Sequence, residues 1–149
     1  MSVHDPEPKR LGMWGAVVNG TRMACMTERD RVPRQQPIVL QITIENVASE
    51  LVRRFVSVHP LFDYDAAVRG PDLESAALTA EGAALLASDR RMLERRIDRD
   101  LEQGESFTEY FYVSDWFQMD RPGEYEVRIS RKDDAGKTLT APPCLIARI

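Results

Sequence analysis

The sequence predicts an all-β protein, an antiparallel β-sandwich of about seven to eight short strands. First, apolar and polar residues alternate with a period of two in several short segments, which is the pattern of a strand with one buried face. Second, turn-forming residues such as Pro-Gly separate these segments at short intervals. Third, the strand patterns do not alternate with helix patterns, so a parallel sheet built from βαβ units is not expected.

The clearest strand pattern lies in residues 38–47, which read IVLQITIENV. Four alternate residues share its apolar face: Ile38, Leu40, Ile42 and Ile44. β-Branched residues occur throughout the segment, and they favour strands. Before it, residues 21–26 form a short semi-apolar segment, and a charged, proline-bounded loop at residues 28–37 separates the two elements.

Two further strands are predicted before residue 70. In residues 52–58 the apolar face consists of Val52, Val56 and Val58, with Arg54 as the exception. Residues 62–69 follow the dipeptide His59-Pro60 and form the second strand. Its apolar face comprises Phe62, Tyr64, Ala66 and Val68. A Gly-Pro-Asp turn then ends this strand.

Residues 73–101 are ambiguous between helix and strand. Their Ala, Leu, Glu and Arg content favours helix, whereas apolar residues spaced by four suit either period. For residues 73–91, around Gly82, the sequence predicts a short helix or an ordered loop. We interpret residues 93–101 as a strand, because a turn signal follows them directly.

Three more strands are predicted in the C-terminal part of the chain. An aromatic strand covers residues 107–113, and a Pro-Gly turn opens the strand within residues 120–130. One face of the latter comprises Tyr125, Val127 and Ile129. The last strand lies in residues 138–149, where Pro142 and Pro143 confine its start to a sheet edge or a bulge.

Length and composition predict one domain. The 149 residues are enough to bury a sizeable core, so we expect a single domain at residues 13–149 after a flexible tail at residues 1–12. The formal net charge of −4 argues against a nucleic-acid or anionic-membrane partner. The sequence lacks an apolar run of the roughly 20 residues needed to cross a membrane, and it lacks a signal-peptide pattern. We therefore expect a cytoplasmic protein, unless an export signal has been removed.

Residues 119–127, which read MDRPGEYEV, place Tyr125 just after the Pro122-Gly123 turn. This arrangement resembles the tyrosine corner of immunoglobulin-like sandwiches, in which the hydroxyl bonds to the upstream backbone. With the strand series above, the chain resembles bacterial immunoglobulin- and fibronectin-III-like β-sandwich domains, and it is loosely similar to the bacterial intracellular proteinase inhibitor family. The resemblance implies an immunoglobulin-like fold and structural roles for Pro122, Gly123 and Tyr125. The similarity to the inhibitor family implies binding to a protease through exposed loops.

The sequence predicts neither a catalytic residue nor a metal site, and no cofactor is expected. The two histidines, His4 and His59, are too few for a multi-histidine metal site. Asp63 and Asp65 share a strand face and, with Asp72, offer carboxylates of the kind that Ca²⁺ prefers, but a solvated strand face explains them more simply. The alternative from another class is a metal-dependent hydrolase that uses Asp63, Asp65 and His59.

The adjacent residues Trp116 and Phe117 lie in the loop before the Pro-Gly turn. In one interpretation, Ser114 and Asp115 cap a short helical turn that folds both rings onto the end of the sandwich as a plug. In the other, the rings form a binding anchor, because loops at sandwich ends carry recognition. We interpret the chain as a non-enzymatic module that binds an unidentified protein partner through loops or an edge strand. A homo-oligomer or a subunit of a larger assembly is a further alternative.

The two cysteines, Cys25 and Cys144, lie on the first and last predicted strands. If these strands run side by side, as they can in immunoglobulin-like sandwiches, a disulfide would close a long loop and stabilise the fold. A reducing cytoplasm favours free thiols instead, and buried cysteine is common as a small apolar residue. We favour two separate, reduced and buried thiols.

Overall fold

The computed structural model describes residues 14–49, 53–88 and 96–149. In these residues the chain forms ten strands: β1 (Thr21–Thr27), β2 (Arg31–Val32), β3 (Leu40–Asn46), β4 (Arg53–Ser57), β5 (Asp65–Arg69), β6 (Ile97–Leu101), β7 (Ser106–Phe111), β8 (Gly123–Lys132), β9 (Thr138–Thr140) and β10 (Cys144–Arg148). It also forms three short helices: α1 (Pro60–Asp63), α2 (Ala80–Ala87) and α3 (Val113–Trp116). The expected tail, residues 1–12, lies outside the described residues. In the described part of the chain, no helix is long and apolar enough to cross a membrane.

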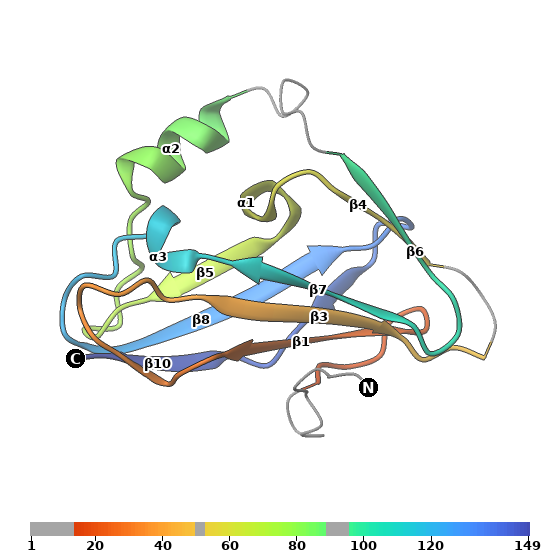
Figure 1. Ribbon diagram of the computed structural model, residues 1–149, viewed down its shortest axis with the longest axis horizontal. Helices are drawn as coiled ribbons and strands as arrows, with labels where there is room; N and C mark the ends of the chain where they lie inside the picture. Colours follow the sequence, from red (N-terminus) through yellow and green to blue (C-terminus); the bar gives the residue numbers. More distant parts are fainter. Residues whose placement is uncertain (1–13, 50–52, 89–95) are drawn as a thin grey trace.

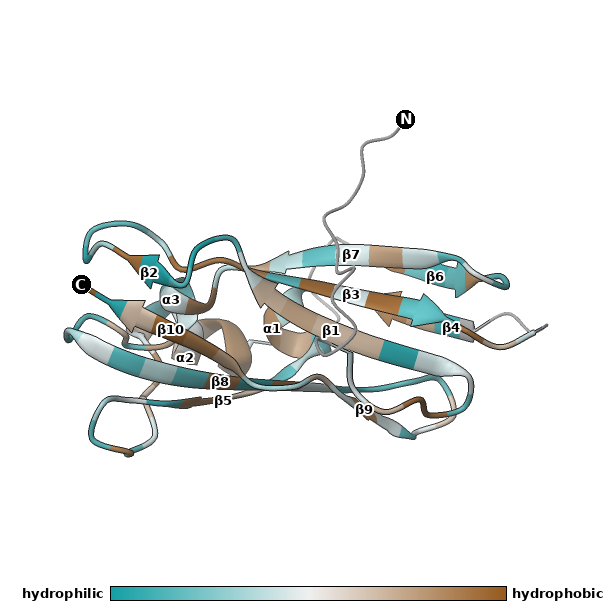
Figure 2. Ribbon diagram, turned by 90° about the horizontal axis from the view of Figure 1, so that it is seen from below, coloured by the Kyte–Doolittle hydropathy of each residue, from teal (hydrophilic) through white to brown (hydrophobic). Residues whose placement is uncertain are grey.

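The described strands form three sheets. The first has the order β1-β3-β7, the second has the order β2-β10-β8-β5 with β9 paired to β8, and the third is the two-stranded ribbon β4-β6. Neighbouring strands are antiparallel except β2 and β10, which run parallel. Figures 1 and 2 show the first two sheets as two layers, with the helices along one side. The prediction of a predominantly antiparallel all-β fold is therefore confirmed.

The hydrophobic core lies between these two layers and consists of side chains from the inner face of each. Four residues in and next to β3, predicted to share one face, are completely buried: Ile38, Leu40, Ile42 and Ile44. Three residues of β8, also predicted to share a face, are buried from the opposite layer: Tyr125, Val127 and Ile129. In residues 38–44 and 125–129 every second side chain is apolar and buried, so each segment presents an apolar face to the other layer.

The predicted last strand is two strands, β9 and β10. Pro142 and Pro143 lie between them, because proline has no N–H group to donate to a ladder. β10 begins beside β8 alone among the described strands and pairs with β2 only at Ala147 and Arg148, so the prediction of a sheet edge at its start is confirmed. The predicted loop at residues 28–37 contains the two-residue strand β2. These short strands raise the number of strands above the predicted seven to eight.

The strand predicted at residues 62–69 begins only at Asp65, and Phe62 lies in helix α1. His59 caps this helix, because its Nδ1 accepts a hydrogen bond from the N–H group two residues later at 3.0 Å. Pro60 occupies the first helical turn, where its missing N–H group has no cost. The alternation of apolar residues suggested a longer strand, but the cap determines where the strand begins.

The face of β4 that points inward is opposite to the predicted one. Phe55 and Ser57 are buried, whereas Val56 is half-buried. Val58, which follows the strand, is buried as predicted. The Phe55 ring packs edge-to-face against Phe107 with ring centroids 5.7 Å apart. The aromatic ring buries more apolar area than a valine, so it determines which face turns inward. Val52 lies outside the described residues.

The ambiguous segment contains both a helix and a strand. The chain around Gly82 forms helix α2, and the Thr79 hydroxyl accepts a hydrogen bond from the Gly82 N–H group at 3.0 Å as its cap. The strand β6 confirms the predicted strand at Ile97–Leu101, and residues 89–95 lie outside the described residues. The aromatic strand β7 ends at Phe111, two residues before its predicted end, because helix α3 follows.

The two cysteines lie on strands of different layers. Cys25 in β1 and Cys144 in β10 are both buried, as expected. Both thiols are free, as expected. Their sulfur atoms are nevertheless in contact, at a distance of 3.2 Å.

Candidate functional site

The outer face of the β1-β3-β7 sheet carries two exposed aromatic side chains. Tyr110 in β7 is 50% exposed, and Tyr112, just after this strand, is 46% exposed. The neighbours of Tyr110 in the strand, Glu109 and Phe111, are buried, so Tyr110 points outward. Because aromatic residues are enriched in protein interfaces, the two tyrosines mark this part of the sheet as a candidate contact surface.

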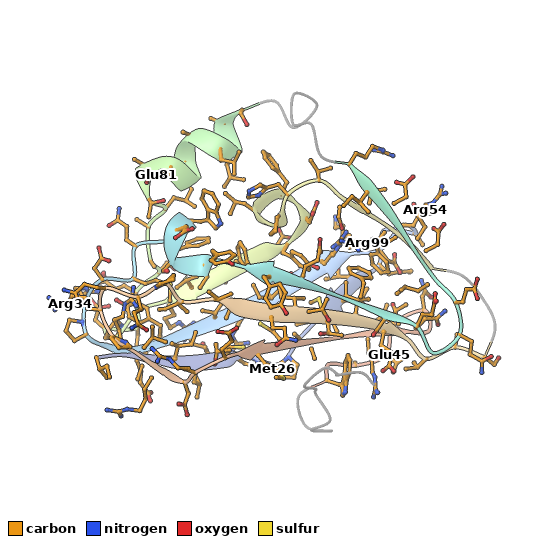
Figure 3. The ribbon with its side chains drawn as sticks, viewed as in Figure 1. Met26, Arg34, Glu45, Arg54, Glu81 and Arg99 are labelled. Carbon is orange, nitrogen blue, oxygen red and sulfur yellow. The ribbon has the colours of Figure 1, made fainter. Side chains whose placement is uncertain are left out.

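The strand register extends this surface across the sheet. It places side chains of three strands in one row: Met26 in β1, Gln41 in β3 and Tyr110 in β7. Met26, labelled on β1 in Figure 3, is half-buried, and so are Gln41 and Val39, which lies two residues before Gln41. We call these five residues the tyrosine face: Met26, Val39, Gln41, Tyr110 and Tyr112. It contains no charged side chain, so a partner can cover it without burying a charge.

A hollow of about 340 Å³ adjoins the tyrosine face at Val39. Its lining comes mainly from the loop between β1 and β3: Glu28, Arg29, Val32, Gln36, Pro37 and Val39. Arg29 donates a hydrogen bond to the side chain of Gln36. The buried Arg148 guanidinium donates to the carbonyl groups of Gln36 at 2.6 Å and Pro33 at 2.9 Å. These bonds hold the loop against β10, so the wall of the hollow is fixed.

Directly behind Tyr110, the inner face of β7 carries a buried carboxylate, Glu109. The Tyr64 hydroxyl donates to Glu109 Oε1 at 2.5 Å, and Arg131 Nη1 lies 3.1 Å from the same oxygen. Burial holds the pKa of Tyr64 well above its usual range, so the phenol stays protonated and keeps donating this bond. A buried charge needs such partners, and here they attach β7 to the opposite layer.

The Arg131 guanidinium lies among aromatic rings. Its central carbon is 4.8 Å from the centroid of the Tyr64 ring and 5.1 Å from that of the Phe55 ring. Arg99 reaches the same cluster from β6, with its Nη2 atom 3.8 Å from Glu109 Oε2, and Figure 3 shows Arg99 between β6 and β7. The strand that carries Tyr110 therefore lies on a buried cluster of charged and aromatic side chains from the opposite layer and from the β4-β6 ribbon.

Trp116 and Phe117, the predicted binding anchor, are half-buried and pack against the core. The Trp116 ring meets the His59 ring edge-to-face, with centroids 5.3 Å apart. The Trp116 carbonyl also accepts a hydrogen bond from the Thr79 N–H group at 2.9 Å, which ties it to the start of α2. The two rings therefore lie as expected for a plug on the end of the sandwich, and they are less exposed than a binding anchor would be.

A helical turn, α3, is present where it was expected, but its predicted cap was wrong. No side chain caps this helix, so neither Ser114 nor Asp115 has that role. The Ser114 hydroxyl instead accepts a hydrogen bond from the Ile38 N–H group at 2.8 Å. The serine thereby connects the end of β7 to the start of β3, and the two strands that carry most of the tyrosine face are joined at this end.

Tyr125 lies just after the Pro122-Gly123 turn, and its hydroxyl donates to the Arg121 carbonyl at 2.9 Å. This is the bond to the upstream backbone that the tyrosine-corner resemblance implies. Gly123 has a φ of +129°, and a Cβ atom at this position would lie 2.7 Å from the Pro71 side chain. Only glycine fits both requirements, so the turn depends on it.

Asp63 and Asp65 line a second hollow, of about 360 Å³, which His59 does not line. The predicted solvated strand face was wrong for Asp63, which lies in α1 and is half-buried. Its two carboxylate oxygens accept hydrogen bonds from a backbone N–H group at 3.0 Å. Asp65 is exposed, and Asp72 forms an ion pair with Arg121 at 3.3 Å. In the residues that the structure describes, no group of three His, Cys, Asp or Glu is arranged to hold a metal ion.

A comparison with protein-family models and with curated proteins finds no match. Among solved structures, the chain is similar to the β-glucosidase from Listeria innocua, in complex with isofagomine and in complex with glucose. In both cases the sequence identity is 10% over 86% of this chain, and the TM-score is 0.43. The chain spans 16% of the length of the β-glucosidase chain.

The sequence analysis missed Tyr110 and Tyr112 as candidate contact residues. A signal was present, because the two tyrosines alternate with Phe107 and Phe111 in the aromatic strand. Glu109 made this signal hard to interpret. It lies on the same strand face as Phe107 and Phe111, and an acidic residue there argues against burial of that face. Only the structure reveals the partners that make burial of this carboxylate favourable.

Proposed function

We propose that this chain is a non-enzymatic module that binds a protein partner, and that the tyrosine face is its contact surface. The observation that carries the proposal is the pair of exposed tyrosines, Tyr110 and Tyr112, in and beside the outermost strand of the sheet. Tyrosine supplies a large apolar contact area with few rotatable bonds and a hydroxyl for hydrogen bonding. It is therefore enriched among the residues that dominate binding energy.

The distribution of charge supports a protein partner. The five residues of the tyrosine face are uncharged, whereas Glu28 and Arg29 line the adjoining hollow. Further along the same face, Arg22 and Glu45 form an ion pair 2.8 Å long. An uncharged centre bordered by charged and polar residues is the usual anatomy of a protein–protein interface.

The position of β7 in its sheet also supports the proposal. β7 pairs with β3 along one edge and with no other described strand. The outer edges of β1 and β5, in contrast, are partly covered by neighbouring chain segments. The Gly15 N–H group donates to the Met23 carbonyl at the edge of β1, and the Ala76 N–H group donates to the Val68 carbonyl at the edge of β5. An edge strand without such a cover is a common place for a partner to bind.

The strand order supports an immunoglobulin-like sandwich as the scaffold. In that fold the first, second, fourth and fifth strands share one sheet, and the third, sixth and seventh strands share the other. The described sheets β1-β3-β7 and β10-β8-β5 match this arrangement except that the first lacks the fourth strand, and the β4-β6 ribbon is an addition. The hydrogen bond of Tyr125 adds to this support. Such scaffolds hold exposed residues in fixed positions, which suits recognition.

The proposal is tested by affinity capture from the native host with three baits. These are the wild-type chain, the double variant Tyr110→Ser with Tyr112→Ser, and the control variant Leu145→Ser. Leu145 is 59% exposed on β10, so the control removes an equally exposed apolar side chain from the other layer. Loss of a hot-spot tyrosine typically weakens binding by about 2 kcal/mol or more, which is roughly 30-fold.

We expect at least one protein to bind the wild-type and Leu145→Ser baits and to be lost with the double variant. Both tyrosines are exposed, so the double variant is expected to keep its fold, and circular dichroism checks this. The proposal fails if every captured protein binds the folded double variant as well as it binds the wild type. If a protein that the double variant no longer captures is a protease, the chain acts as a protease inhibitor.

A further inference from the structure

Cys25 and Cys144 are 119 residues apart in sequence, yet their sulfur atoms are in contact across the two layers. Cys25 belongs to β1 of the first sheet and Cys144 belongs to β10 of the second. The Sγ atoms are 3.2 Å apart, and the Cys144 thiol also lies 3.1 Å from the Cys25 carbonyl oxygen, to which it can donate. The side chains point toward one another from opposite inner faces, as a cross-link between the layers requires.

We propose that this pair is a site of oxidative modification, at which an intrachain disulfide joins the two layers. A disulfide has a sulfur–sulfur bond of about 2.05 Å, so the two atoms need to approach by only about 1 Å. The inference is independent of the proposed function, since neither sulfur belongs to the tyrosine face.

The two thiols differ in pKa and in exposure, so they have different roles in forming the disulfide. The contact with the Cys25 side chain lowers the pKa of Cys144, whereas the pKa of Cys25 is raised by the same contact and by burial. Cys144 is also the more accessible residue, at 6% exposure against 1% for Cys25. We therefore assign the attack on an oxidant to Cys144, the more accessible of the two thiols.

With a small-molecule disulfide such as oxidised glutathione as the oxidant, the reaction balances in two steps. The Cys144 thiolate attacks one sulfur of the oxidant, forms a mixed disulfide and releases one glutathione. The Cys25 sulfur then attacks Cys144 Sγ, forms the intrachain disulfide and releases the second glutathione. Two protein thiols are oxidised, one small-molecule disulfide is reduced to two thiols, and the two protons remain with the glutathione products.

Formation of the bond would change the unfolded chain more than the folded one. A disulfide between these residues closes a loop of 119 residues, which restricts the unfolded ensemble and leaves the folded state with little rearrangement. For a loop of this length and a chain of this size, we expect the midpoint of thermal unfolding to rise by roughly 10 °C. The increase is reversed when a dithiol reductant opens the bond.

The experiment uses the purified full chain, incubated with oxidised glutathione and then unfolded in the presence of an alkylating reagent. Because the chain has only two cysteines, an intrachain disulfide can have only one connectivity. We expect mass spectrometry to show an unalkylated monomer that is lighter by two hydrogen atoms, and calorimetry to show the higher midpoint. Dithiothreitol is expected to restore both thiols and the lower midpoint.

The variant Cys25→Ala provides the matched control, because it keeps the more accessible Cys144. Its midpoint is expected to stay the same with and without oxidant, apart from any effect of a mixed disulfide with glutathione. The wild-type chain, compared before and after oxidation, gives the answer even if this variant is poorly folded. Two alkylated thiols after oxidation, or disulfides that form only between chains, would overturn the proposal.

Discussion

The Arg131 guanidinium lies 3.1 Å from the Glu109 carboxylate, and both side chains are almost completely buried. The pair joins β8 to β7 and therefore connects the two layers directly behind Tyr110. Removing one partner of a buried ion pair leaves an uncompensated charge in the core. We expect Arg131→Met to lower the free energy of unfolding by about 3–5 kcal/mol in urea titrations.

The control for this prediction is Arg128→Met on the same strand. Arg128 is exposed, and an exposed substitution changes stability by less than about 0.5 kcal/mol. If Arg131→Met is as stable as Arg128→Met, the buried ion pair does not support β7 in the way described.

The raised pKa of Tyr64 predicts a loss of stability at alkaline pH. Burial keeps the phenol protonated in the folded state, whereas in the unfolded chain it ionises near a pKa of about 10. The contribution of Tyr64 is therefore fully present below about pH 10 and is lost as the pH rises through the folded-state value, by up to about 1.4 kcal/mol per pH unit. We expect the free energy of unfolding, measured in urea at about pH 9 and pH 11, to fall more for the wild type than for Tyr64→Phe.

A matched variant for the alkaline experiment is Tyr112→Phe, which removes the hydroxyl of an exposed tyrosine. It is expected to follow the wild-type pH dependence. An identical pH dependence for Tyr64→Phe and the wild type would mean that Tyr64 is not the buried group responsible.

The Tyr125 hydroxyl bond predicts a modest and purely structural effect. Tyr125→Phe removes the bond to the Arg121 carbonyl and keeps the buried ring, so we expect a loss of about 1 kcal/mol in the free energy of unfolding. Binding through the tyrosine face is expected to remain unchanged, because the bond lies in the other layer. Equal stability of this variant and the wild type in urea titrations would show that the corner does not stabilise the turn.

Gly82 provides a test in which packing reverses the effect of helix propensity. In an unconstrained helix, alanine is more favourable than glycine by about 1 kcal/mol. A Cβ atom on Gly82 would lie 2.5 Å from the Trp116 carbonyl oxygen, however, so α2 would have to move away from α3. We expect Gly82→Ala to lower the free energy of unfolding by about 1–3 kcal/mol.

The exposed residue Ala84 of the same helix provides the comparison for Gly82. Ala84→Gly is expected to cost about 1 kcal/mol through helix propensity alone. A thermal-unfolding measurement in which Gly82→Ala raises the midpoint would contradict the close packing of α2 on Trp116.

Strand segments with an uninterrupted run of apolar inner residues were predicted well from the sequence. The alternation around Ile42 and that around Val127 each identified the buried face, because the nearest inner residues are apolar. The prediction failed where a single side chain outweighs the pattern. Phe55 turns the opposite face of β4 toward the core. The ring of His59 caps α1, so β5 begins later in the chain than predicted.

The candidate site was harder to predict, because its strand contains a buried charge. Glu109 is favourable inside only because Tyr64 and Arg131 meet it there from distant parts of the chain. Sequence periodicity contains no information about such partners, so the outward position of Tyr110 was not recognised. Trp116 was selected instead for its residue type, and the structure shows that much of its surface is covered.

The most direct test of the central claim is site-specific photo-cross-linking in the native host. A benzophenone amino acid is introduced at position 110 in one chain and at position 128, exposed on the opposite layer, in another. We expect a discrete adduct with one host protein from position 110 that is absent from position 128 and is competed away by excess unmodified chain. An adduct with the same protein from position 128 and none from position 110 would contradict it.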